Sequence, residues 1–185
     1  MGIFDSIFGG KAKKTPHEIE LEKRATEGDI DAIQELATIT FNREDYESAA
    51  SWALTGAGYN DAWCMHLIGR IAYDNKNYAE SMKWYEKNVN INNYSLSATE
   101  LGFMYLNLDD NPQLPTDAYK ANYYFDLAVR GDPSNGDAAL GLAFCLIGQE
   151  DSNVNRIRSL LQTAINNSVI EGNKNLAREL LSQIS

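Results

Sequence analysis

Residues 98–131 read ATELGFMYLNLDDNPQLPTDAYKANYYFDLAVRG, and this stretch decides the fold of the chain. Its apolar residues follow the spacing of an amphipathic helix before the proline-containing loop 107–116, and again after it. Gly102 lies within the first half, and Ala121 and Ala128 lie within the second. Small residues at such positions let two helices approach closely. The stretch therefore predicts two helices that pack against each other as a hairpin.

The same pattern recurs on both sides of this stretch. Three related stretches at similar intervals begin with an apolar residue and a glycine, at Ile68-Gly69, Leu101-Gly102 and Leu140-Gly141. A second recurrence joins Tyr46 and Tyr78, each of which follows a short polar turn. Recurrence at intervals of roughly 20–50 residues is typical of repeat proteins, in which each unit buries its apolar face against its neighbours.

The chain resembles the tetratricopeptide repeat family, and more closely its Sel-one-like variant. The residues that carry the resemblance in the third repeat are Leu101, Gly102, Tyr105, Asp117, Ala121, Tyr124, Phe125, Ala128 and Gly131. The loop 107–116 lies where the Sel-one-like variant has its insertion. The chain departs from the family pattern at Ala37, which replaces a glycine, and at Ser81 and Asn88, which replace alanines. The fourth repeat also lacks the loop aspartate in register.

The resemblance implies an all-α fold, an α-α superhelix of about four helix-turn-helix repeats with capping helices at both ends. This repeat domain would span residues 15–185. Its repeats would lie at about 30–60, 61–93, 94–133 and 134–168. Thr15 and Glu18 match a capping box, which predicts the first capping helix over about 16–27. The C-terminal capping helix is predicted over 170–184.

Residues 1–14 differ in kind from the repeats. Ile3, Phe4, Ile7 and Phe8 share one face of a short amphipathic segment, and lysines follow it. Such a face could contact an anionic membrane or the groove of a partner. The alternatives are that it packs on the first repeat or stays disordered.

Composition and charge place the chain among acidic proteins of a reducing compartment. It has 26 acidic and 16 basic residues, for a net charge of -10. An acidic surface repels phosphate, which argues against a nucleic-acid partner. Neither a signal peptide nor a long apolar run is recognisable, and two cysteines are too few for a disulfide framework. We therefore expect a cytoplasmic protein, and a bacterial one.

The sequence offers little material for catalysis or for a metal site. The histidines are His17 and His66, and the cysteines are Cys64 and Cys145. Cys64 and His66 would point to different faces of one helix, and the other two residues are remote in sequence. The loop 107–116 lacks the glycine and the glutamate of a calcium-binding loop. We predict no enzymatic activity, no metal and no cofactor.

In the family that the chain resembles, the first helices of the repeats line a concave groove. The positions that match the groove are candidate partner-binding residues: Gln34, Thr38, Trp63, His66, Arg70, Tyr73, Thr99 and Phe103. Aromatic residues and arginine dominate binding hot spots, although Trp63 and Tyr73 could equally pack beneath a neighbouring helix. The expected function is a non-enzymatic adaptor or scaffold that binds a protein or peptide partner in this groove.

Two narrower functions fit the same sequence. The acidic charge on a short chain would suit a small bacterial immunity protein or inhibitor that masks a basic toxin or effector. A peripheral membrane adaptor would instead use residues 1–14 as its anchor.

Overall fold

The computed structural model describes residues 14–147, 149 and 153–184, and in this part of the chain it contains ten α-helices and no strand. The helices are α1 (Pro16–Thr26), α2 (Ile30–Asn42), α3 (Tyr46–Gly58), α4 (Ala62–Asp74), α5 (Tyr78–Asn92), α6 (Ser95–Leu106), α7 (Ala118–Gly131), α8 (Gly136–Ile147), α9 (Val154–Asn167) and α10 (Glu171–Gln183). They begin and end close to where the apolar periodicity predicts helices. The predicted all-α class is confirmed.

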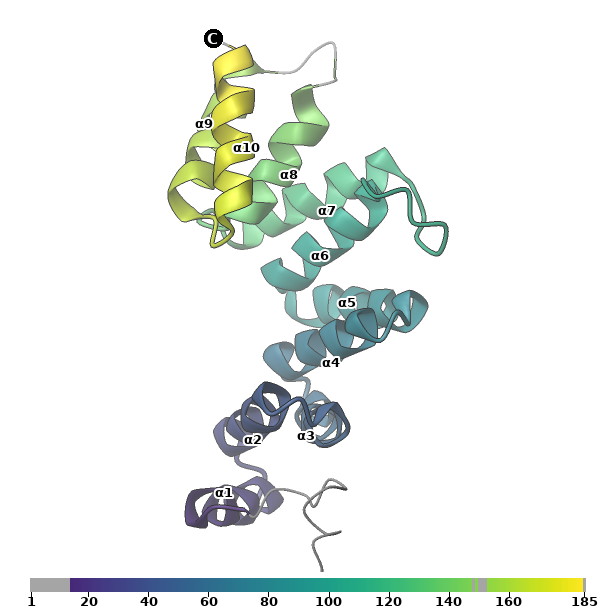
Figure 1. Ribbon diagram of the computed structural model, residues 1–185, viewed down its shortest axis with the longest axis vertical. Coiled ribbons are helices and arrows are strands. Elements are labelled where there is room, and N and C mark those ends of the chain that lie inside the picture. Colours follow the sequence, from purple (N-terminus) through teal and green to yellow (C-terminus); the bar gives the residue numbers. More distant parts are fainter. Residues whose placement is uncertain (1–13, 148, 150–152, 185) are drawn as a thin grey trace, which may run out of the picture.

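The helices stack into an elongated superhelix, with α1 at one end and α10 at the other (Figure 1). α2 packs on α3, α4 on α5, α6 on α7, and α8 on α9, so each of these pairs forms a hairpin. Each hairpin packs on the next through α3 and α4, α5 and α6, or α7 and α8. The apolar core therefore runs from one hairpin to the next, as in other repeat architectures.

The turns between the first five helices share one geometry. Each contains a residue with positive φ, and these residues recur at equal intervals: Gly28, Glu44, Asn60 and Lys76. The next residue donates its N–H to a carbonyl in the preceding helix, as Asp61 does to Gly56 O at 3.2 Å, which is the Schellman pattern. The side chain of that same residue then caps the following helix, in the order Asp29, Asp45, Asp61 and Asn77. One residue thus ends one helix and begins the next, which keeps the turns short.

At the first capping helix, the structure confirms the capping box. The Thr15 side chain accepts a hydrogen bond from the Glu18 backbone N–H, and the Glu18 carboxylate accepts one from the Thr15 backbone N–H. The helix ends before Gly28, whose φ is 87°. Both ends of α1 are therefore fixed by local sequence.

The repeat glycines mark places where a ring lies directly on a helix backbone. A Cβ atom added at Gly69 would lie 2.4 Å from the ring of Tyr85. One added at Gly102 or Gly141 would lie 2.6 or 2.3 Å from the ring of Phe125. Phe125 is completely buried between these two glycines. Any larger residue would overlap the rings, so the close approach requires glycine at these positions.

In the first repeat, two alanines occupy the positions that Gly69 and Tyr85 occupy in the second repeat. Ala37 stands where Gly69 stands in the second repeat, and Ala53 follows it at the distance at which Tyr85 follows Gly69. Both alanines are completely buried. Since an alanine occupies the position of the ring, a Cβ atom can occupy the position of the glycine. The departure of Ala37 from the family pattern is therefore compensated within its own repeat.

A buried polar network lies between two apolar clusters, one built on α1 to α4 and the other on α5 to α10. Asn88 on α5 is completely buried and donates from Nδ2 to Ala62 O and Ser97 Oγ, both at 2.8 Å. Its Oδ1 accepts from Asn92 Nδ2 at 2.9 Å. These bonds connect α4, α5 and α6. The asparagine that replaces the family's alanine thus joins three helices.

The long loop between α6 and α7 is held against the end of α6 by Asn107. Its Nδ2 donates to Asn111 O at 3.1 Å, Leu114 O at 3.3 Å and Thr116 Oγ1 at 3.0 Å. Its Oδ1 accepts from the Asn111 N–H at 2.9 Å. Asp117 then caps α7 through its side chain. The insertion is therefore an ordered loop, and Leu114 packs on the apolar core.

At the other end of the stack, α10 packs on both α8 and α9. Ala177 on α10 is completely buried, and Leu180 and Leu181 pack on the same core. Leu142 on α8 is 1% exposed beneath this end of the stack. α10 therefore covers part of the apolar surface of the last hairpin, as a terminal repeat requires.

Candidate binding groove

A cavity of about 290 Å³ opens between α2, α4 and α6, which are the first helices of three successive hairpins. Its walls include Thr38, Phe41, Trp63, His66, Arg70 and Leu96. The cavity is therefore built from the helices whose positions predicted a groove.

A second cavity, of about 340 Å³, lies further along α4 and α6 and reaches the loop that Asn107 orders. Its walls include Tyr73, Tyr78, Glu100, Phe103, Asp109 and Leu114. Tyr73 follows Arg70 by one helical turn on α4, and Glu100 follows Leu96 by one turn on α6. The two cavities therefore follow each other along the same two helices, and we refer to them together as the α4–α6 groove.

Comparison with known proteins identifies the fold. No protein-family model matches the chain, and no curated protein matches it significantly. A Sel1 repeat protein from Oxalobacter formigenes matches with a TM-score of 0.68 at 17% identity, over 94% of this chain and 81% of that one. A protective antigen of uropathogenic Escherichia coli strains, which displays an SLR fold, matches with a TM-score of 0.70 at 19% identity, over 96% of this chain and 39% of that one. The chain has the Sel1-like repeat fold.

Six of the eight residues predicted from the Sel1-like repeat pattern line the groove: Thr38, Trp63, His66, Arg70, Tyr73 and Phe103. The other two make contacts between helices. Gln34 donates from Nε2 to Asp61 Oδ2 at 2.9 Å. Thr99 is 5% exposed, donates to Ser95 O at 2.8 Å and accepts from Asn135 Nδ2 at 3.0 Å. Thr99 therefore joins α6 to the start of α8, and we leave it out of the candidate site.

Some residues that line the groove were not predicted from the repeat pattern. Glu100 and Tyr78 line the second cavity, although neither is among the predicted site residues. The spacing of Leu96, Glu100 and Phe103 is i, i+4, i+7, which places all three on one face of α6. That spacing is the sequence signal for Glu100. Leu114 has no such signal, because the folding of the loop brings it to the groove.

The His66 ring is held from several sides. Its Nδ1 lies 3.2 Å from Ser97 Oγ, and the rings of Tyr85 and Tyr94 lie 5.4 and 5.7 Å from its centroid. Ser97 Oγ accepts a hydrogen bond from Asn88, so its own proton is available to His66 Nδ1. This arrangement favours a neutral imidazole with its proton on Nε2. The groove therefore presents an uncharged aromatic ring at this point.

The burial of His66 predicts how the stability of the folded chain depends on pH. Burial, assisted by the positive charge of Arg70, lowers the pKa of His66 to about 4 from its ordinary value of 6.5. Between these pH values the unfolded chain binds more protons, so stability falls as the pH falls. We expect the wild type to lose on the order of 3 kcal/mol more unfolding free energy than His66→Gln between pH 6.5 and 4. Urea unfolding at both pH values measures the difference, and parallel pH profiles for the two proteins would contradict it.

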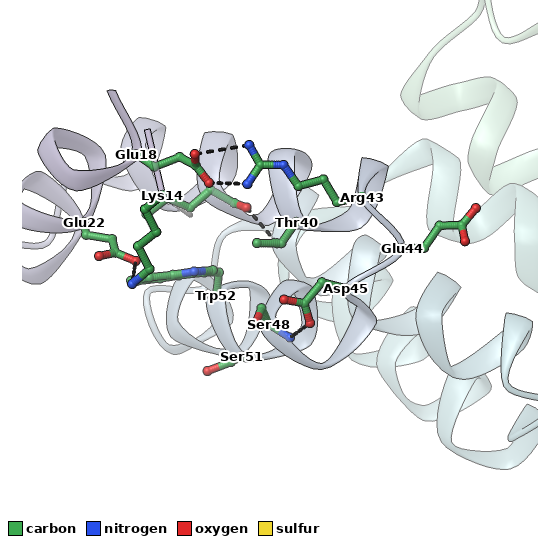
Figure 2. Close-up of a pocket in the computed structure, with 11 residues that line it drawn as sticks. Lys14, Glu18, Glu22, Thr40, Arg43, Glu44, Asp45, Ser48, Ser51 and Trp52 are labelled. Carbon is green, nitrogen blue, oxygen red and sulfur yellow. Dashed lines mark hydrogen bonds and ion pairs between the residues drawn. The ribbon is translucent and has the colours of Figure 1, made fainter. Parts of the chain in front are cut away.

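A larger cavity, of about 530 Å³, lies between α1, α2 and α3 (Figure 2). Figure 2 shows the Arg43 guanidinium facing the Glu18 carboxylate, with N–O distances of 2.5 and 3.1 Å. Lys14 faces Glu22, with their N and O atoms 2.5 Å apart. The hydrogen bond from Arg43 lowers the pKa of Glu18 to about 2, which keeps this carboxylate ionised and paired. Because these charges are paired within the cavity, we assign them to the attachment of α1 to the first repeat.

The thiols of the chain are protonated at neutral pH. Burial raises the pKa of Cys64, and it raises the pKa of Cys145 to about 11. A thiol with a raised pKa is a poor nucleophile and a poor metal ligand. In the part of the chain that the structure describes, no group of three histidine, cysteine or acidic side chains is arranged to hold a metal ion.

The predicted membrane or partner contact of the N-terminal segment concerns Ile3, Phe4, Ile7 and Phe8. These four residues lie outside the described residues. Among the described residues, no helix combines the length and the apolar character that crossing a bilayer requires.

Proposed function

We propose that the chain is a non-enzymatic interaction module that binds a segment of a protein partner in the α4–α6 groove. The observation that carries the proposal is the exposure of large apolar side chains in two consecutive cavities. Leu96 is 47% exposed and Tyr73 is 40% exposed, and each lines one of the cavities. Exposed apolar groups gathered in a concave surface mark interaction sites. The Sel1-like repeat fold, which is common among protein-interaction modules, supports the same function.

The aromatic walls of the groove are already ordered without a partner. The Tyr73 ring lies edge-on to Tyr78, with 5.1 Å between their centroids. The Phe103 ring lies edge-on to the buried Phe125 at 4.9 Å. Side chains that are fixed before binding lose less conformational entropy when a partner arrives. The groove is therefore suited to binding an extended or helical segment without rearrangement of its walls.

One pair of residues beside the groove, Ser97 and His66, resembles a catalytic pair, but its geometry does not support catalysis. Ser97 and His66 have the residue types of a nucleophile and its base. Ser97 is completely buried, however, and its oxygen already accepts the hydrogen bond from Asn88. Ser97 also lines neither cavity of the groove. The pair therefore fits the role of a support for the groove wall.

We expect Trp63→Ala to weaken the binding of a groove-directed peptide by about thirtyfold, because a buried tryptophan contact at a binding hot spot is worth 2 kcal/mol or more. The peptides would be selected from a random library of short linear sequences, displayed on phage, against the folded chain. Isothermal titration calorimetry with the synthetic peptides would give the dissociation constants for the wild type and the variant.

The matched control is Tyr119→Ala, which removes an aromatic side chain that is 91% exposed on α7 and lines neither cavity. Its affinity for the same peptides should equal that of the wild type. Thermal melts followed by circular dichroism would show that all three proteins are folded. The proposal fails if the library yields no binding peptide, or if the peptides bind Trp63→Ala as tightly as the wild type.

A further inference from the structure

The second cavity of the groove contains a carboxylate without a partner. Glu100 is mostly buried, and among the described residues its carboxylate has neither a hydrogen bond nor an ion pair. Burial raises the pKa of Glu100, and only the positive charge of Arg70 acts in the opposite direction. Arg70 is itself paired with Asp74, with an N–O distance of 3.8 Å. An acidic group that is partly removed from water and has no cation bound to it is stabilised by a positively charged partner.

We propose that this cavity receives a lysine or arginine side chain of the bound segment. The inference rests on the proposed function and names the kind of residue that the groove selects. Glu100 would pair with the charged end of the side chain, and Asp109 lines the same cavity with a second carboxylate. The rings of Tyr73, Tyr78 and Phe103 supply apolar surface for the alkyl stem and aromatic faces for a cation.

The charges around the cavity favour a basic occupant over an acidic one. Asp74 and Asp137 both raise the pKa of Glu100, which means that both contribute negative potential at its carboxylate. The whole chain carries a net charge of -10. A carboxylate or phosphate group would meet like charge here, whereas a cation is attracted both at long range and in contact.

The first cavity fixes the position of the basic residue relative to an apolar one. Leu96 lines the first cavity, while Glu100 and Phe103 line the second cavity on the same helix. The separation of these residues along α6 is about 6–10 Å at 1.5 Å per residue. An extended peptide covers that distance in about two or three residues. We therefore expect an apolar side chain in the first cavity and a basic side chain two or three positions away.

The test uses the peptides that the wild-type chain selects from the random library. Each selected peptide would be paired with a synthetic copy in which norleucine replaces the lysine, or citrulline the arginine, so that the charge is removed and the alkyl stem is kept. We expect the wild type to prefer the charged peptide by about tenfold, and Glu100→Gln to lose that preference. Glu47→Gln removes the same charge from an exposed position on α3 and should keep the preference. Raising the salt concentration should weaken the preference of the wild type and leave Glu100→Gln little changed.

The outcomes separate this inference from the proposed function. Peptides that depend on Trp63 but show no spaced basic residue would overturn the inference and leave the groove as the binding site. Equal discrimination by the wild type and Glu100→Gln would also overturn it. Peptides that ignore Trp63 altogether would remove the proposed function, and the inference with it.

Discussion

Phe125→Ala is expected to lower the free energy of unfolding by about 3–5 kcal/mol. The ring is completely buried, and it lies against the backbone at both Gly102 and Gly141. Because helix backbones form these two walls, they cannot relax into the space as flexible side chains would. Most of the space left by the Phe125 ring would therefore stay empty in the variant. The variant would also lose the edge-on contact between the Phe125 and Phe103 rings.

Urea unfolding followed by circular dichroism measures this loss. The matched control is Tyr119→Ala on the same helix, which removes a 91% exposed ring and should change stability by no more than about 0.5 kcal/mol. A loss below about 1 kcal/mol in Phe125→Ala would mean that α6, α7 and α8 close over the space, and that the glycines do not hold the helices at a fixed distance.

The features that the sequence predicts well are those decided within one turn or one hairpin. Thr15 and Glu18 form their capping box within a single turn, so the residues alone identify it. Gly102 and Phe125 belong to the same hairpin, and their types and spacing are enough to predict a close helix contact. In both cases the interacting residues are near each other along the chain, or are linked by a repeating pattern.

The groove was harder to predict because its walls come from different hairpins and from a loop. Thr99 occupies a groove position in the family pattern, yet Asn135 from the start of α8 covers its hydroxyl. Leu114 enters the second cavity only because Asn107 folds the loop back on α6. Neither contact leaves a periodic signal in the sequence. A repeat pattern therefore predicts which helix face is concave, but the neighbouring repeats decide which residues on it remain accessible.

Asn88 illustrates the same limit inside the core. The sequence shows that an asparagine replaces an alanine. It does not show that the side chain of this asparagine donates hydrogen bonds to Ser97 on α6 and to the Ala62 carbonyl on α4. By the family pattern alone, Asn88→Ala would restore the usual residue and would be expected to stabilise the chain. The observed geometry predicts the opposite result.

We expect Asn88→Ala to lower the free energy of unfolding by about 2–4 kcal/mol, although alanine has the higher helix propensity. The change removes the donor to Ala62 O and Ser97 Oγ and the acceptor of Asn92 Nδ2, and it leaves a space in a fully buried site. Urea unfolding measures the loss. Asn90→Ala makes the same substitution at an exposed position on the same helix and should change stability by no more than about 0.5 kcal/mol.

A second variant tests whether the loss comes from unmade hydrogen bonds. Ser97 is completely buried, so after Asn88→Ala its hydroxyl keeps His66 as its one side-chain partner among the described residues. If unsatisfied polar atoms cause the loss, Ser97→Ala in the Asn88→Ala background should cost at least about 1 kcal/mol less than Ser97→Ala in the wild type. Strictly additive effects would instead show that the bond to Ser97 does not cause the loss, and would assign it to the empty volume and to the bonds with Ala62 and Asn92. Coupling between the two sites would show that the polar network stabilises the contact between α5 and α6, which lies where one apolar cluster ends and the other begins. It would thereby stabilise α6, which carries Leu96 and Glu100 into the groove.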